Sequence, residues 1–317
     1  FLAERKATGL RVDHPDGLWD PAAYFRQLQQ SYTTQRIPPL HDTLVNSNRT
    51  PTPPWPLYVI AEKILSKGES LPEDWAVYGT TGYDFLNQVN GIFVAHANRE
   101  AVDKIYRDFI GKETNFRNLI NSTKKMTMLI SLASEINSLS HQLDRISERN
   151  RHYRDFTLNS LTFGIREVVA CLSVYRTYND ASTGTVAERD QKYIKAAVED
   201  AKRRNPRTAR ALFDFIQETL LLSNLQHFHA EDRRQVIDFV MELQQLTGPV
   251  MAKAVEDTTF YAYNRLTSLN EVGGDPEQFG LSLEAFHRQN ADRQRHWPHS
   301  MLATSTHDTK RSEDVRA

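Results

Sequence analysis

The middle of this sequence, from about residue 97 to residue 247, has the apolar spacing of packed α-helices. Two stripes step by three and four positions: Leu129, Leu132, Ile136, Leu139, Leu143 and Ile146, then Leu158, Leu161, Ile165, Val168, Leu172 and Tyr175. Further helices are expected over 187–204, 208–223 and 231–246, with a break at Thr247-Gly248-Pro249. Because no fixed repeat period is visible, a solenoid is not indicated. The sequence therefore predicts a large all-α block.

Short strand-like runs lie on both sides of this block, at residues 8–13, 57–61 and 300–304. Runs of this length and apolarity are typical of strands buried on both faces, as in parallel sheets. Asp20-Pro21 has the pattern of a helix start, the proline-rich segment 46–56 excludes regular structure, and a short helix is expected near 282–289. Strands before and after the helices predict an α/β fold with a large all-α insertion.

The charge and cysteine content narrow the function. Lys and Arg total 39 against 40 Asp and Glu, and this absence of a basic excess argues against a nucleic-acid or membrane partner. The one cysteine, Cys171, excludes an internal disulfide framework and suits a reducing compartment, so we expect a cytoplasmic protein. Its default role is that of a small buried apolar residue.

Each expected strand ends at an acid, namely Asp13, Glu62 and Asp308. The carboxyl edge of parallel strands is where active sites gather, and three carboxylates there suit glycosyl transfer. A divalent metal site is an alternative, because His14, Asp16 and His307 lie beside them. Helix caps and turn formers are the purely structural alternative.

The neighbours of two of these acids favour catalysis. Arg11 stands two positions before Asp13, so the two side chains lie on the same side of a strand. A guanidinium there lowers the pKa of the carboxyl group and keeps it ionised, as a nucleophile requires. Glu62 follows an apolar run, where desolvation raises its pKa, as a general acid requires. Alternation directs Lys63 to the other side of the strand.

Several segments carry a family resemblance. Residues 9–18 (GLRVDHPDGL) resemble the nucleophile motif of the α-amylase superfamily. The resemblance narrows to the maltooligosyltrehalose synthase family through residues 61–65 (AEKIL), 79–87 (GTTGYDFLN), 253–261 (KAVEDTTFY), 270–276 (NEVGGDP) and 305–314 (STHDTKRSED). It implies a partial (β/α)8 TIM barrel of about strands four to seven that carries a helical domain. The barrel would comprise residues 1–95 and 250–317, the insertion residues 96–249, and the chain looks like an internal excerpt.

The resemblance also implies roles. Asp13 matches the nucleophile, Glu62 the acid/base and Asp308 the transition-state stabiliser. Arg11 matches the partner that orients the nucleophile, and His307 matches the histidine that binds sugar hydroxyls. Our further candidates for substrate-binding or lid residues are His14, Tyr83, Lys253, Glu256, Asp257 and Tyr261. One departure is that Asp16 and Gly17 stand where the superfamily has lysine and histidine.

The implied activity converts the reducing-end α-1,4 bond of a maltooligosaccharide into an α,α-1,1 bond, with retention of configuration, no cofactor and no metal. The expected partners are the maltooligosaccharide and a downstream trehalose-releasing hydrolase. Two alternatives stay open: a hydrolase of α-glucans from the same superfamily, and a helical structural or interaction module without activity. We expect the isolated 317 residues to be inactive.

Overall fold

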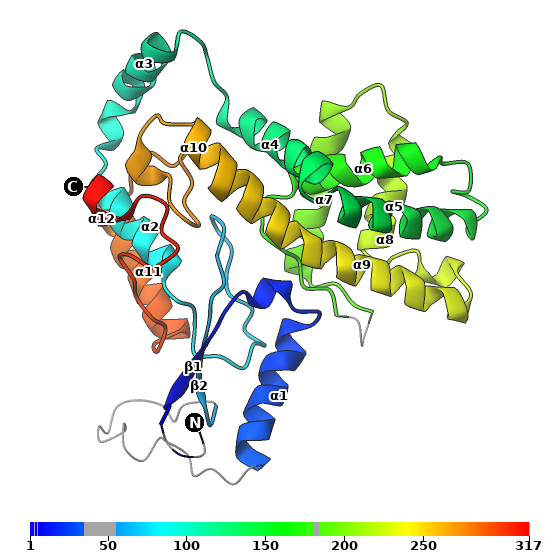
Figure 1. Ribbon diagram of the computed structural model, residues 1–317, viewed down its shortest axis with the longest axis horizontal. Helices are drawn as coiled ribbons and strands as arrows, with labels where there is room; N and C mark the ends of the chain where they lie inside the picture. Colours follow the sequence, from blue (N-terminus) through cyan, green and yellow to red (C-terminus); the bar gives the residue numbers. More distant parts are fainter. Residues whose placement is uncertain (3, 5, 35–54, 181–183, 317) are drawn as a thin grey trace. The chain divides into compact units, whose positions relative to one another are not determined.

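The computed structural model describes residues 1–2, 4, 6–34, 55–180 and 184–316 (Figure 1). The chain forms two compact units, one of Phe1–Asp103 with Leu266–Ala317 and one of Lys104–Arg265. We call them the first and the second unit. The expectation for the proline-rich segment falls outside the described residues, except at positions 55 and 56. Among the residues that are described, no helix is both long and apolar enough to span a bilayer.

Two parallel strands form the sheet of the first unit. β1 (Gly9–Val12) pairs with β2 (Tyr58–Ala61), with Val12 opposite Ala61. Residues 77–81 run alongside β2 and parallel to it. Tyr78 N–H donates to Val59 O over 2.7 Å, and Ala61 N–H donates to Gly79 O over 2.9 Å. The strands expected at 8–13 and 57–61 are therefore confirmed.

Helix α1 (Pro21–Thr34) covers this sheet. Asp20 starts the helix, since its carboxylate accepts from Ala23 N–H over 2.8 Å. Phe25 is fully buried and its ring centroid lies 5.2 Å from that of Trp75. The buried amide of Gln29 donates to Leu57 O and accepts from Leu57 N–H, both over 3.0 Å, which ties α1 to the start of β2.

The remaining helices of the first unit are α2 (Tyr83–Ile92), α11 (Leu283–His296) and α12 (Ser312–Arg316), and α3 (Arg99–Ile110) begins there. The Ser282 hydroxyl accepts from Ala285 N–H over 3.2 Å, so α11 starts where expected. The helix ends later than expected, at His296, because Arg293 in its last turns donates to Asp84 of α2 over 2.7 Å.

The second unit is a helical bundle, as expected for the middle of the chain. Its helices are α4 (Phe116–Ile130), α5 (Ala133–Glu148), α6 (Leu158–Cys171), α7 (Glu188–Arg204), α8 (Arg210–Leu220), α9 (Ala230–Met251) and α10 (Phe260–Ala262). The stripes predicted from the sequence supply much of its core, including Ile136, Leu143, Leu161 and Ile165, all fully buried.

Two local expectations for this unit are wrong. Leu129 is 57% exposed, because α4 closes where Ser131 and Leu132 N–H both donate to Thr127 O, and α5 then starts in a new phase. The expected break at Thr247-Gly248-Pro249 does not occur either. Helix α9 continues through Pro249 to Met251 and passes into a π-helix at Ala252–Thr259. Burial of Leu246 and Val250 outweighs the poor helix propensity of glycine and proline there.

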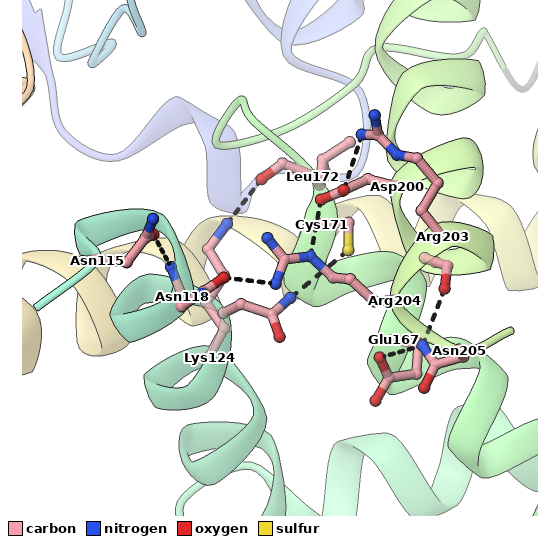
Figure 2. Close-up of polar contacts among 12 residues, drawn as sticks. Asn115, Asn118, Lys124, Glu167, Cys171, Leu172, Asp200, Arg203, Arg204 and Asn205 are labelled. Carbon is pink, nitrogen blue, oxygen red and sulfur yellow. Dashed lines mark hydrogen bonds and ion pairs between the residues drawn. The ribbon is translucent and has the colours of Figure 1, made fainter.

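Polar contacts join α4, α6 and α7 (Figure 2). Arg204 donates to Asp200 Oδ2 and to Asn118 Oδ1, each over 3.0 Å. Lys124 is fully buried and donates to Leu172 O over 2.7 Å, and burial lowers its pKa to about 8. Burial raises the pKa of Cys171 to about 12, which suits an inert packing role rather than a reactive thiol.

Candidate active site

The sheet brings Asp13 and Glu62 together. Because Val12 pairs with Ala61 in parallel register, the residues that follow them leave the sheet side by side. Glu62 N–H donates to Val12 O over 2.9 Å, which fixes the spacing of the two chains at that point. The expectation that the two strands deliver their acids to one edge is confirmed.

Arg11 joins the two carboxylates. Its Nη1 donates to Asp13 Oδ1 over 2.8 Å, and its Nη2 donates to Glu62 Oε1 over 2.7 Å. The backbone N–H of His14 donates to Glu62 Oε2 over 3.0 Å, with His14 itself in a left-handed conformation at φ 43°. The sequence predicted the contact between Arg11 and Asp13. It did not predict that the same guanidinium binds Glu62.

The two carboxyl groups have opposite protonation tendencies. Hydrogen bonds from Glu62 and Arg11 hold the pKa of Asp13 below its ordinary value. Burial, together with the hydrogen bond to Asp13, raises the pKa of Glu62 to about 7, although Arg11 opposes this. The expected directions are therefore both confirmed. One group of the pair is ionised near neutral pH while the other still holds its proton over part of that range.

The strand expected at 300–304 is not formed, and this expectation is wrong. Met301 N–H donates to Thr80 O over 3.1 Å, but the Ser300 hydroxyl accepts from Thr80 N–H and donates to Thr80 O, over 3.0 and 3.2 Å. A side chain thus occupies backbone groups that a β-ladder would use. The segment lies beside residue 80 without becoming a strand.

The loop that follows this segment still carries its two polar residues to the site. His307 Nε2 lies 3.2 Å from Asp308 Oδ2, and one ring nitrogen of His307 lies within 4.8 Å of carboxylate oxygens of both Asp13 and Glu62. The Thr306 hydroxyl donates to Tyr83 OH over 3.0 Å. Burial raises the pKa of Tyr83 to about 12, and the charges of Glu62 and Asp308 add to this increase.

The structure thus gathers six of the predicted side chains around one edge of the first unit: Arg11, Asp13, Glu62, Tyr83, His307 and Asp308. His14 lies there too and contributes its backbone N–H to Glu62, whereas the remaining four predicted residues belong to the second unit. Lys253, Glu256 and Asp257 lie on the π-helix, where buried Glu256 accepts from Tyr175 OH, and Tyr261 is exposed on α10.

Sequence reasoning missed an internal ion pair network beside the site. Lys63 is fully buried, and its Nζ lies 3.3 Å from Asp16 Oδ2 and 3.0 Å from Glu69 Oε1. Lys63 follows Glu62, and Asp16 lies three residues after Asp13, so the pair links the segments that leave β2 and β1. The signal that could have found it is the acid at position 16 where the resembled superfamily has a lysine.

A metal site was the main alternative for these acids. Asp13, Glu62 and His307 do present three potential ligand atoms to one another. Arg11, however, contacts both carboxylates, and its guanidinium repels a cation there. Asp16 is buried against Lys63, which withdraws it from such a ligand set. The arrangement therefore fits acid–base and nucleophilic chemistry better than metal binding.

A cavity of about 510 Å³ lies elsewhere in the first unit, between residues 65–73, α2 and α11. Its lining includes Asn87, Arg293 and Trp297, but none of Asp13, Glu62 or Asp308. The lysine and the arginine in this lining are already paired, since Arg293 contacts Asp84 and Lys67 lies 3.9 Å from Asp275. We therefore place the candidate active site at the carboxyl edge of the strands and not in this cavity.

Comparison with known proteins gives a consistent result, although no protein-family model matches. The chain is 31% identical over its full length to a putative maltooligosyl trehalose synthase of Mycobacterium tuberculosis, and it spans about a third (35%) of that protein. The structure of maltooligosyltrehalose synthase from Arthrobacter ramosus is 31% identical over 99% of this chain and 34% of that chain, with a TM-score of 0.77. A hypothetical maltooligosyl trehalose synthase of Sulfolobus tokodaii is 30% identical over 98% of this chain and 33% of its own length, with a TM-score of 0.66. The chain is thus a relative of the maltooligosyltrehalose synthases, homologous to a stretch of about a third of their length, as its motifs predict.

Proposed function

We propose that this chain carries the catalytic carboxylates of a maltooligosyltrehalose-forming enzyme. The observation that supports this most directly is the pairing of Asp13 and Glu62 through Arg11, with their pKa values displaced in opposite directions. Retaining glycoside chemistry uses two carboxyl groups about 5 to 5.5 Å apart, and the nearest approach of these two is within 4.8 Å.

In the first step, an ionised Asp13 oxygen attacks the anomeric carbon of the penultimate glucose. Protonated Glu62 gives its proton to the departing 4-oxygen, so the old glycosidic bond breaks as a glycosyl-aspartate bond forms. Because the pKa of Glu62 is raised, Glu62 still holds this proton near neutral pH, and Arg11 keeps Asp13 ionised. A free glucose is left beside the covalent intermediate.

In the second step, Glu62 acts as a base on the 1-hydroxyl of that glucose. The hydroxyl oxygen attacks the same anomeric carbon, the proton passes to Glu62, and the bond to Asp13 breaks. Two inversions at one carbon give net retention and an α,α-1,1 link. Water would divert the intermediate to hydrolysis, so the released glucose must be held in place.

His307, Asp308 and Tyr83 are the groups we assign to holding the sugar ring at this centre. Asp308 would also stabilise positive charge on the ring in the transition state. Lys253, Glu256, Asp257 and Tyr261 of the second unit stay predicted as substrate-binding or lid residues. His14, whose backbone N–H binds Glu62, would contact the substrate beside the acid.

β1, β2 and the segment at 77–81 support a wider architectural proposal. Their parallel pairing is what adjacent strands of a (β/α)8 barrel require, with the acids at the edge where barrel enzymes place their active sites. We propose that the first unit belongs to such a barrel and that the second unit is its helical insertion. The boundaries expected from the sequence, residues 1–95 and 250–317 for the barrel and 96–249 for the insertion, stay a prediction, and the compact units divide instead after Asp103 and after Arg265. The downstream partner would be a trehalose-releasing hydrolase in the cytoplasm.

An assay on maltopentaose tests the function. With the full-length protein that contains these residues, we expect loss of reducing ends without release of glucose, and Asp13→Asn or Glu62→Gln should reduce turnover by at least about 10²-fold. A gain of reducing ends would instead identify a hydrolase. The 317-residue chain alone should form no trehalosyl product, since it spans about a third of its relatives.

A further inference from the structure

The loop that carries His307 and Asp308 contains no helix or strand between residue 300 and the start of α12. Short contacts within the loop shape it: Asp308 N–H donates to Thr306 Oγ1 over 3.2 Å, and Thr309 Oγ1 donates to Thr306 O over 2.7 Å. Such contacts set the local turn but do not fix the loop relative to the sheet. Its placement at the site needs anchors outside the loop.

One anchor is a buried carboxylate on another segment. Glu271 has no exposed surface, and its side chain accepts from three successive backbone N–H groups just after Asp308. Lys310 N–H donates to Oε1, and the N–H groups of Arg311 and Ser312 donate to Oε2 over 3.1 and 3.3 Å. Hydrogen bonds to an ionised acceptor are about twice as strong as neutral ones.

Glu271 is itself held in a turn that is fixed to α2. Gly274 N–H donates to Glu271 O over 2.7 Å, and Asn87 Nδ2 donates to Val272 O over 2.8 Å. Asn87 lies on the same helix as Tyr83, whose hydroxyl accepts from Thr306. Helix α2 therefore binds the loop at Thr306, before Asp308 in the sequence, and the turn at 270–276 binds it at residues 310–312, after Asp308.

We propose that Glu271 is a positioning residue for the reaction. By binding the backbone at 310–312, it sets where His307 and Asp308 stand relative to Asp13 and Glu62. This role rests on the proposed function. It gives a reason why the segment 270–276, which carries none of the proposed catalytic residues, is among the segments that resemble the family. Glu271 touches no reacting atom; it acts through the loop.

The kinetic consequence follows from how sensitive such sites are to geometry. A displacement of about 1 Å in a supporting group can lower the rate about 10²-fold. Glu271→Gln keeps the shape of the side chain but removes its charge and turns an NH₂ group toward backbone donors. We expect kcat to fall about 10²-fold and KM to change less than about threefold, because the loss is felt mainly in the transition state.

The test pairs kinetics with hydrogen exchange of the loop. In the full-length protein, E271Q should speed backbone exchange in the peptide that spans 305–314 by at least about tenfold. Glu167→Gln is the matched control, because Glu167 is also a buried carboxylate, bound to Lys125 and Asn205 in the second unit, each over 2.7 Å. E167Q should leave both the loop exchange and kcat unchanged.

The outcomes separate cleanly. Faster loop exchange with unchanged kcat would overturn the positioning role, and unchanged exchange would overturn the anchor itself. If E271Q does not fold, Glu271→Asp decides the matter, since its shorter carboxylate should give a smaller loss of kcat and intermediate exchange. If the wild-type protein forms no trehalosyl product, the proposed function fails, and the exchange measurement still decides whether Glu271 holds the loop.

Discussion

The guanidinium of Arg11 donates to the carboxylate of Glu62 over 2.7 Å while its other amino group binds Asp13. One rigid, planar side chain therefore spans both proposed catalytic acids. Its fork sets their separation, and its charge acts on both at once. The positive charge of Arg11 explains why the two carboxyl groups can lie so close together while Asp13 stays ionised.

Replacing Arg11 with methionine should move the whole pH profile of kcat/KM to higher pH. The charge of Arg11 lowers the pKa of both Asp13 and Glu62, so its loss raises both. The acidic limb, which reports ionisation of Asp13, and the basic limb, which reports the proton on Glu62, should shift in the same direction. Arg11→Lys, which keeps the charge without the fork, should shift them less. An unshifted profile for R11M would contradict this role of Arg11.

The wild-type enzyme should lose activity as the pH rises through about 7. The pKa of Glu62 is raised to about 7, so its proton is present below that pH and is lost above it. Above pH 7, kcat/KM should therefore fall about tenfold for each unit of pH. E62Q should abolish this limb and lower turnover on maltopentaose. With a maltosyl fluoride, whose leaving group needs no proton, E62Q should still form the covalent intermediate at nearly the wild-type rate, seen as a burst of released fluoride. A basic limb that persists in E62Q would assign the proton to another group.

Much of the proposed catalytic pair could be predicted from the sequence, because the alternation of side chains along one strand is a local property. The alternation that places Arg11 beside Asp13 and the apolar run before Glu62 can both be read from the few residues next to each acid. The second contact of Arg11 could not be predicted, since it depends on the pairing of two strands that brings together Arg11 and Glu62, 51 residues apart in sequence.

Replacing Lys63 with methionine should strongly destabilise the first unit. Removing the ammonium leaves Asp16 and Glu69 buried without their shared partner, a loss of about 3 to 5 kcal/mol. All four tryptophans, at positions 19, 55, 75 and 297, lie in the first unit, so tryptophan fluorescence in urea follows its unfolding selectively.

The matched control for this change is Lys6→Met, which breaks an exposed pair with Glu4 in the first unit. Its urea midpoint should equal that of the wild type, because exposed pairs contribute little. A K63M midpoint equal to that of K6M would show that the buried network contributes nothing to stability.

Replacing Gly82 with alanine should disturb the approach of residues 301–303 to α2. Gly82 has φ 93°, and a Cβ there would lie 2.6 Å from Ala303 N and 2.7 Å from Met301 O, both backbone atoms. Gly68 is the control, since it also has a positive φ, 77°, but open space around its Cβ position. G82A should lower the urea midpoint more than G68A does. The free energy of unfolding of G82A should fall by about 1 to 3 kcal/mol more. Equal midpoints would mean that the segment moves aside without cost.

The loop at 300–312 shows where prediction from sequence stopped. Its apolar start resembles a strand, but the Ser300 hydroxyl takes the backbone groups of Thr80 that would form the ladder. Its anchor, Glu271, lies 39 residues from Lys310, and a lone glutamate in a turn carries no local sign of such a contact. Contacts made by single side chains to residues far away in the sequence leave no repeating pattern of residues from which they could be predicted.

We propose that Asp13 forms a covalent bond to the sugar, and this bond can be trapped and identified. The full-length protein is incubated with a 5-fluoro maltosyl fluoride, which slows breakdown of the intermediate, and its peptides are then measured by mass spectrometry. We expect one added fluoromaltosyl group on the peptide that contains Asp13, and none in Asp13→Asn. A label on another residue, or turnover of the fluoride without any label on Asp13, would contradict this proposal.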